Sequence, residues 1–463
     1  MATKQERSRP ESAFQDNVEE GDKNDSRVLL AVFVLLLVDL LAFTVILPLM
    51  PSLLDYYGQV DQGGLYGAIQ EYVDWFALTL GIPQTRRFNA VLFGGILGSL
   101  FSLLQFLSAP LIGALSDVYG RKPLMLLSAV GIACSYSVWA VSYTFGVFVL
   151  ARVLGGISKG NVSLATAVVA DLKSAKSKGH GMAVIGIAFS LGFLVGPSIG
   201  AWFSRISDEG HFFSTPALFA LTLSICNIVF ITFFLPETLP KEKRAKSIGN
   251  GLSEASFLIN PPSLFSFSAV KNLTKKELES LQSLGSTYFL YLFLFSGLEY
   301  TLTFLTHNKF QYTSMQQGRM FLYMGLIMLV TQGGYSRRIS PGTEKKIASR
   351  GMAILVPSFL LIGAAESTLL FYVGLGLFSF ASATVVPCLT AMTSAYGGTD
   401  QKGTVMGILR SLGALARALG PVAASTVYWG LGALPCYAMG GLLLFIPVLM
   451  LAKVQTTTDK TDE

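Results

Sequence analysis

The chain has 463 residues, of which 52% are hydrophobic and only 13% are charged. Soluble domains carry about a quarter charged residues, so this composition excludes an ordinary soluble protein and predicts an all-α membrane protein. The net charge of +6 is not concentrated in a soluble basic domain, which argues against a nucleic-acid partner and favours contact with anionic lipid headgroups.

Apolar runs long enough to cross a bilayer, which takes about 20 residues, predict twelve transmembrane helices. The runs are 28–51, 89–112, 123–143, 145–170, 180–203, 214–235, 285–307, 315–335, 350–366, 368–395, 403–429 and 431–452. The first run follows a long polar stretch and is not a cleavable signal. The intervening composition predicts a disordered N-terminus at 1–27, a six-helix bundle at 28–235, a linker at 236–284, a second six-helix bundle at 285–452 and a tail at 453–463.

Positive charge is unevenly distributed between alternate loops. Cytoplasmic loops retain Lys and Arg, and the even helix count places both termini on the side where these residues gather. The bases on that side include Lys4, Arg7, Arg9, Lys23 and Arg27 before the first run and Lys241, Lys243, Arg244 and Lys246 in the central linker. Both termini are therefore predicted to be cytoplasmic. The plasma membrane is the default location, with an acidic organelle or the nuclear envelope as alternatives, because the tails carry no readable address.

An internal repeat indicates how the helices are arranged. The stretch KGHGMAVIGIAFSLGFLVGP, residues 178–197, aligns without gaps to KGTVMGILRSLGALARALGP, residues 402–421, at an offset of 224. Parallel repeats of this kind form two pseudo-symmetric halves with a substrate site between them, and rocking of the halves gives alternating access. The helix-breaking pairs Gly196-Pro197 and Gly420-Pro421 predict gating elements in the fifth and eleventh helices.

The stretch GALSDVYGRKP, residues 113–123, places an acid and two bases between two apolar runs. Gly113 and Gly120 would allow close approach of the backbone, while Asp117 can cap a helix end and Arg121 can pair with carboxylates. We expect these residues and Lys122 to form a cytoplasmic latch in the outward-open state.

Two further segments predict local structure. Residues 52–88 form a long outer loop that would make a helical cap or contact a partner protein. Thr274 and Glu277 fit a capping box, which predicts a helix leading into the seventh run.

At these motifs the chain resembles the major facilitator superfamily, and its drug-proton antiporters in particular. The pattern G-x-L-x-D-x-x-G-R-K is complete at residues 113–122, and LARVLGGISKG, GFLVGPSIGA and DLLAFTVILPLMP are similar to signatures of the fourth, fifth and first helices. The resemblance implies a twelve-helix transporter and a proton-transfer role for Arg152, with simple pairing to a carboxylate or a lipid headgroup as the alternative. The second half departs from the pattern, because GGYSRRISPGTEKK keeps the bases Arg337 and Arg338 without the Asp. We therefore expect an asymmetric cytoplasmic gate.

Ionisable residues within the spans are expected to face a cavity and to carry function. They are Asp39, Arg152, Lys159, Glu299, Arg319, Arg410 and Arg417. Arg152 and Lys159, like Arg410 and Arg417, are seven residues apart and so share a helical face. Five bases against two acids would attract anions, and we expect Lys159 and Arg410 to form the anion clamp.

Other side chains complete the expected site. Ser296, Glu299 and Thr303 form a polar stripe on the seventh helix, and Phe43 and Phe295 would cover the apolar part of a substrate, with simple packing as the alternative. Asp39 and Glu299 are candidate proton carriers. The alternative for Asp39 is a fixed ion pair with Arg410 that holds the halves together.

The sequence therefore predicts a monomeric secondary transporter that exports amphipathic organic anions, in exchange for protons, through a lipid bilayer. The alternatives are an exporter of cationic or zwitterionic drugs such as tetracyclines, and a non-transporting receptor or scaffold. Catalytic triads, nucleotide loops and metal-ligand spacings are not found, and the four cysteines lie in apolar runs. We expect no enzymatic activity, no cofactor and no metal.

Overall fold

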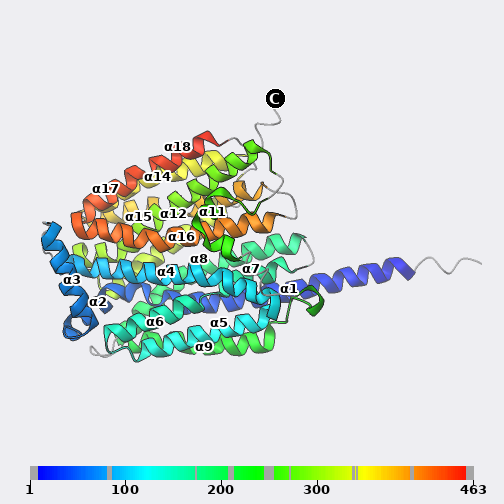
Figure 1. Ribbon diagram of the computed structural model, residues 1–463, viewed down its shortest axis with the longest axis horizontal. Helices are drawn as coiled ribbons and strands as arrows, with labels where there is room; N and C mark the ends of the chain where they lie inside the picture. Colours follow the sequence, from blue (N-terminus) through cyan, green and yellow to red (C-terminus); the bar gives the residue numbers. More distant parts are fainter. Residues whose placement is uncertain are drawn as a thin grey trace, which may run out of the picture.

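The computed structural model describes residues 9–80, 86–172, 175–206, 213–244, 255–270, 273–335, 339, 342–396 and 401–454. Regular structure in these ranges is helical throughout (Figure 1). Eleven helices are long and apolar enough to cross a membrane within the ranges described. The eighth predicted run is also helical, but its α-helix, α13 (Ser314–Val330), has 17 residues and continues as the five-residue π-helix η3 (Thr331–Tyr335).

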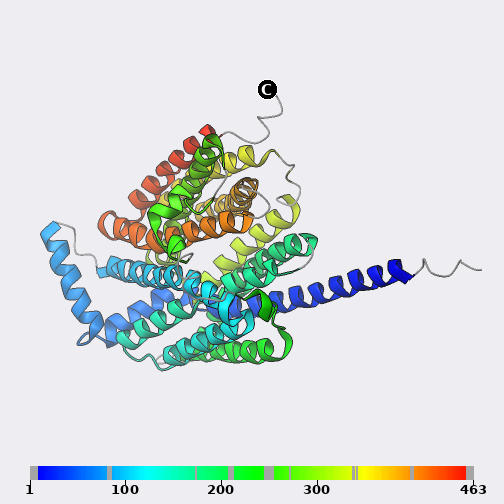
Figure 2. The ribbon, with the colours of Figure 1, turned by 45° about the vertical axis from the view of Figure 1, so that its right-hand side comes forward.

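The helices form two groups, which Figure 2 shows as an upper and a lower bundle. The N-terminal half contains α1 (Arg9–Thr44), α4 (Arg86–Tyr119), α5 (Arg121–Ala140), α6 (Phe145–Ser158), α7 (Asn161–Ala170), α8 (Ala175–Ile206) and α9 (Ser214–Phe234). The C-terminal half contains α12 (Lys275–Phe310), α13, α14 (Glu344–Ala364), α15 (Thr368–Ser394), α16 (Lys402–Leu431), α17 (Ala433–Leu443) and α18 (Phe445–Lys453). We call the end where α1 enters the bundle and α18 ends the terminal face, and the opposite end the α3 face.

The segment between the first two spans is helical, as expected. It follows the short η1 (Leu47–Leu49) and consists of α2 (Met50–Val60) and α3 (Leu65–Leu80), which lie at the α3 face (Figure 1). The Asp61 carboxylate accepts hydrogen bonds from the backbone N–H groups of Tyr66 and Phe145, at 3.2 and 3.3 Å. Tyr66 packs edge-on against Phe93 and Phe145, and this burial raises the pKa of its phenol. The neutral ring therefore anchors α3 to the N-terminal half.

The structure differs from the sequence prediction at the N-terminus. Residues 9–27, which we expected to be disordered, belong to α1, and this extension projects beyond the bundle (Figure 1). Glu19 and Lys23 are four residues apart in the sequence, a spacing that favours a helix.

The described part of the linker between the halves is partly helical. It contains the short helices η2 (Lys241–Lys243) and α11 (Pro261–Ser266). The predicted capping box is confirmed: the Thr274 hydroxyl accepts from the Glu277 N–H, and the Glu277 carboxylate accepts from the Thr274 N–H. Helix α12 consequently begins at Lys275, inside the predicted linker.

The repeated Gly-Pro motifs lie where helices pack most closely. In α8, a Cβ added at Gly192 or Gly196 would collide with α1, and one added at Gly200 would collide with the backbone of Val45, directly after α1. A Cβ added at Gly420 of α16 would meet the backbone of α12 and the Ser296 hydroxyl at 2.5 Å. The helices themselves continue through Pro197 and Pro421. These glycines therefore let α1 pack on α8, and α12 on α16, within each half.

The two halves are joined mainly near the α3 face. The Tyr300 hydroxyl donates to the Gly94 carbonyl at 2.7 Å, and His307 Nε2 lies 2.7 Å from an Asp55 carboxylate oxygen. Further contacts across the halves in this region are Val422 N–H to Ser99 Oγ, Trp429 Nε1 to Asn89 Oδ1 and Ser198 Oγ to the Gly318 carbonyl. The conformation is therefore closed at the α3 face.

Candidate functional site

Lys159 is held by an acid from its own half. Its ammonium lies 2.6 Å from an Asp39 carboxylate oxygen, and the two side chains are only 4% and 3% exposed. The ammonium also lies 4.7 Å from the centre of the Phe43 ring. This pair is possible because α6 ends at Ser158 and α7 begins at Asn161, so that the backbone breaks at Lys159.

Two expectations are corrected by this ion pair. Asp39 does not pair with Arg410, so its bridge ties α1 to the fourth span rather than joining the two halves. Lys159 is neutralised in this conformation, and its expected role as a free cation for an anion is not met here. The seven-residue spacing to Arg152 assumed a continuous helix, and the break at Lys159 removes that basis.

Arg152 lies on α6 among aromatic rings. Its guanidinium carbon is 5.6 to 5.7 Å from the ring centres of Phe101, Trp139 and Phe148. The side chain is buried, and its Nε has no hydrogen-bond partner. Cation–π attraction replaces part of the lost hydration. The described residues give Arg152 no carboxylate partner, so its charge stays uncompensated in this conformation.

Only one of the three aromatic contacts of Arg152 could have been predicted from the sequence. Phe148 lies four residues before Arg152, a spacing that places the two on one helical face. Phe101 and Trp139 come from α4 and α5, and sequence reasoning missed them because tertiary packing alone brings them together.

Arg410 faces the opposite half of the protein. One guanidinium nitrogen lies 3.7 Å from the Met182 sulfur on α8, and the side chain is partly exposed. Within the ranges described, no carboxylate lies at ion-pair distance from Arg410. Arg417, two turns further along the unbroken α16, is exposed, and both arginines interact electrostatically with Tyr288.

Glu299 is the acid predicted within a span of the C-terminal half, and the described residues give it no direct partner. It is partly buried in the middle of α12, and no ion pair or hydrogen bond to its carboxylate is found among the described residues. Arg417 is near enough to act on it electrostatically. Arg319 on α13 is exposed and takes no part in this group.

The other residues predicted for the site are occupied mainly by packing contacts with their own or neighbouring helices. The Ser296 hydroxyl is buried without a hydrogen-bond partner, and the Thr303 hydroxyl donates to the Tyr300 carbonyl at 3.3 Å. Phe295 stacks on Phe378 of α15, with 4.9 Å between ring centres. The packing alternative therefore describes Phe295 in this conformation, while Phe43 contacts the ammonium of Lys159.

The charged cluster at the terminal face is formed as a network inside the N-terminal half. The Arg121 guanidinium lies 2.6 Å from Asp117 and 3.0 Å from Asp171 at the end of α7. Its backbone N–H donates to the Glu237 carboxylate at 2.9 Å, and Lys122 Nζ donates to the Thr232 carbonyl at 2.7 Å. We expected these residues to form a latch in the outward-open state, yet the network is present in a conformation whose halves meet at the α3 face. Its formation therefore does not require contact between the halves at the terminal face.

The two glycines of this motif differ in role. Gly120 has φ of 107° and separates α4 from α5, and a Cβ there would collide with the Glu237 carboxylate. Gly113 lies inside α4, and an added Cβ would meet nothing within 4 Å. The expectation of a close approach at Gly113 is therefore wrong for this conformation. Arg337 and Arg338, named for the second-half motif, lie outside the described residues.

The family model for the major facilitator superfamily matches residues 32–421. The chain belongs to the major facilitator superfamily. It is an integral multi-pass membrane protein and a secondary transporter, not an enzyme. Membership confirms the predicted all-helical transporter fold, although the structure gives eleven rather than twelve spans by length and composition within the ranges described. A group of three or more potential metal-ligating side chains is not found in the described part of the chain.

Several known proteins are similar to this chain over almost its whole length. Mouse (Mus musculus) major facilitator superfamily domain-containing protein 10 is 52% identical over 444 residues, which is 95% of each protein. The crystal structure of the human organic anion transporter MFSD10 (TETRAN) matches with a TM-score of 0.78 and 52% identity, covering 92% of this chain and 99% of that chain. The class D tetracycline resistance protein of Salmonella ordonez is 27% identical over 436 residues, covering 90% of this chain and 95% of the relative.

Proposed function

We propose that this transporter exports amphipathic organic anions by alternating access, in exchange for protons. The observation that carries the proposal is Arg410, a partly exposed cation that reaches across to Met182 of the other half and has no described carboxylate partner. A guanidinium binds a carboxylate through two parallel hydrogen bonds. The similarity to a protein described as an organic anion transporter supports the same substrate class.

Arg417 and Arg152 add further fixed positive charge within the spans. Arg417 lies two turns from Arg410 on α16, and Arg152 carries an uncompensated charge in the opposite half. Tyr300 of the C-terminal half lies near Arg152, so separation of the halves at the α3 face would change the surroundings of that arginine. An anion bound first at Arg410 would then meet further fixed positive charge on its way through the protein.

The proposed orientation in the membrane rests on the distribution of Lys and Arg between the two ends of the bundle. The terminal face is assigned to the cytoplasm because Lys and Arg gather in the loops of that side, which places both chain ends in the cytoplasm. Contacts between the halves near the α3 face then make this conformation inward-facing. The plasma membrane remains the default location, with an acidic organelle as the alternative that would suit proton exchange equally well.

Glu299 is the proposed proton carrier. It is a carboxyl group in the middle of a span, and Arg417 acts on it electrostatically without forming a direct pair. Asp39 is a second candidate only if its bond to Lys159 breaks during the cycle, and Arg152 would then act as a fixed charge that favours the deprotonated carboxylate. Glu299→Gln is expected to abolish the response to a pH gradient while anion exchange between equal-pH compartments persists.

The test is uptake of a radiolabelled amphipathic carboxylate into proteoliposomes that contain the purified full-length chain. A pH gradient should drive uptake, and excess unlabelled anionic amphiphile should compete more strongly than a cationic amphiphile of similar size. Absence of uptake with an intact, monodisperse protein would contradict transport of organic anions.

Tetracycline export is the second candidate, because a tetracycline resistance protein is similar over most of the chain. The same vesicles discriminate the two candidates. Stronger competition by tetracycline and by organic cations than by carboxylates would favour this alternative, whereas the unpaired arginines favour the anion.

A further inference from the structure

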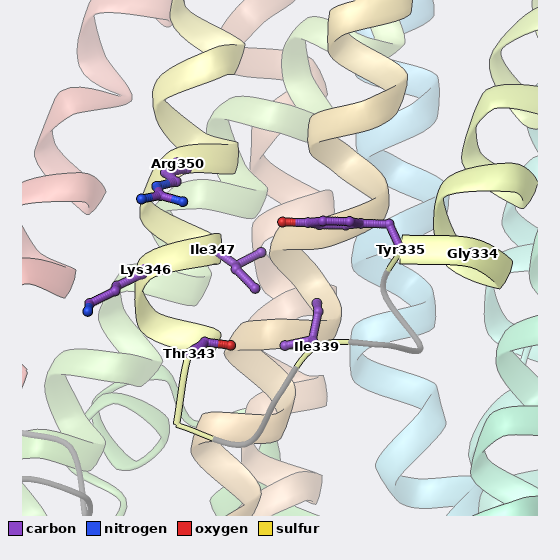
Figure 3. A pocket seen from close by; sticks show the side chains of 7 residues that line it. All are labelled: Gly334, Tyr335, Ile339, Thr343, Lys346, Ile347 and Arg350. Carbon is purple, nitrogen blue, oxygen red and sulfur yellow. The ribbon is translucent and has the colours of Figure 1, made fainter.

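A pocket of about 610 Å³ lies at the terminal face of the C-terminal half (Figure 3). Gly334 and Tyr335, at the end of η3, form one side of it, and the first two turns of α14 form the other. Ile339 and Ile347 contribute apolar surface. The pocket thus lies close to the beginning of a membrane span, where headgroups meet the hydrocarbon.

Two bases line this pocket from α14. Lys346 and Arg350 are one helical turn apart, and both side chains are exposed. Neither forms an ion pair with an acid in the described part of the chain. The pocket lining thus combines two cations on one helical face with a phenol and apolar side chains, a composition that suits an anion joined to an apolar group.

At the start of the corresponding helix in the first half, a base is neutralised by an acid of the protein itself. There Arg121, at the start of α5, pairs with Asp171 at 3.0 Å. At the repeat offset of 224 residues, Lys345 corresponds to Arg121 and Ala395 corresponds to Asp171. The second half therefore lacks the acid, and Lys345 instead donates to the carbonyls of Ala452 and Val454, at 2.9 and 2.7 Å.

Apolar surface leads from the membrane towards the pocket. Leu322, Leu326 and Val330, spaced four residues apart on α13, are 46%, 55% and 65% exposed, and the chain then continues into Gly334 and Tyr335. The Tyr335 ring also packs against Phe380 of α15, with 5.9 Å between ring centres. A lipid can lay an acyl chain along this stripe while its headgroup enters the pocket.

We propose that this pocket binds the phosphate headgroup of an anionic phospholipid, with Lys346 and Arg350 as its two cationic contacts. This inference takes the cytoplasmic orientation of the terminal face from the proposed function, since anionic lipids are enriched in that leaflet. It does not depend on which solute is transported.

The test measures retention of phosphatidylglycerol, against phosphatidylcholine, by the detergent-purified full-length protein in native mass spectrometry. The wild type should retain phosphatidylglycerol preferentially. Lys346→Gln/Arg350→Gln should weaken retention by at least about tenfold, because it removes two charge-assisted contacts. Lys346→Arg/Arg350→Lys, which preserves charge, should retain the lipid. Orientation in a bilayer does not enter this measurement, so its failure is distinct from a failure of transport.

A matched control is Lys275→Gln/Lys276→Gln, which removes two exposed bases at the start of α12 and should leave retention unchanged. Thermal unfolding of each variant identifies a folding defect, and Arg350→Gln alone replaces the double variant if that variant does not fold. Equal retention by wild type and the glutamine variants, equal loss in the control, or displacement of the lipid by inorganic phosphate or by an organic carboxylate in the same concentration range would overturn the proposal.

Discussion

Breaking the ion pair between Asp39 and Lys159 should strongly destabilise the protein. The charged atoms lie 2.6 Å apart, and the side chains are 3% and 4% exposed, respectively. Asp39→Asn leaves a buried ammonium without a counter-charge, and Lys159→Met leaves a buried carboxylate. Removal of one partner from a buried pair costs about 3 to 5 kcal/mol. Lys159→Met also loses the contact with Phe43 at 4.7 Å, a cation–π interaction of up to about 2 kcal/mol when desolvated.

The double variant tests whether Asp39 and Lys159 stabilise the protein as an ion pair or as two independent side chains. With both charges removed, Asp39→Asn/Lys159→Met should be more stable than either single variant, with a coupling energy of at least about 2 kcal/mol. The free energy of unfolding in mixed detergent micelles provides the measurement. A control cycle on Arg244 and Glu237, 3.6 Å apart and partly exposed, should give a coupling energy below about 1 kcal/mol. Additive effects at Asp39 and Lys159 would refute the pairing.

Three further predictions concern binding, packing and gating. Arg410→Gln should weaken binding of an anionic amphiphile by about tenfold or more, with Arg410→Lys intermediate, in equilibrium binding to the purified protein; equal affinities would count against its role. Gly196→Ala should destabilise the protein by about 1 to 3 kcal/mol in thermal unfolding, because the added Cβ collides with α1. Gly186→Ala on the same helix is the control: its Cβ meets nothing within 4 Å, so it should be neutral or slightly stabilising. Asp55→Ala removes the contact with His307 across the halves and should increase spin-label distances across the α3 face; unchanged distances would show that the pair does not hold this face closed.

The fold was largely predictable because its signals are local. Apolar runs of bilayer length define the spans, and the repeat of 224 residues relates the halves. The eighth run shows where the pattern is less informative, since hydrophobicity does not distinguish α13 from the π-helix that follows it. The helix over residues 9–27 was missed because a polar segment without an apolar face gives no signal for packing.

The site was less predictable because one local break changes its pairing. Helical spacing placed Arg152 and Lys159 on the same face, but the interruption after Ser158 turns Lys159 towards Asp39. The expectation for Arg410 and Arg417 used the same spacing on α16, which is unbroken, and both arginines do share the neighbour Tyr288. Long-range partners depend on such backbone details, which composition and period do not contain.

The most direct measurement is a cryo-EM map of the protein with an amphipathic carboxylate bound. The account predicts density for the carboxylate within hydrogen-bond distance of the Arg410 guanidinium, with Asp39 still bonded to Lys159. A carboxylate bound instead to Lys159, with Asp39 displaced and Arg410 pointing away towards lipid, would contradict it.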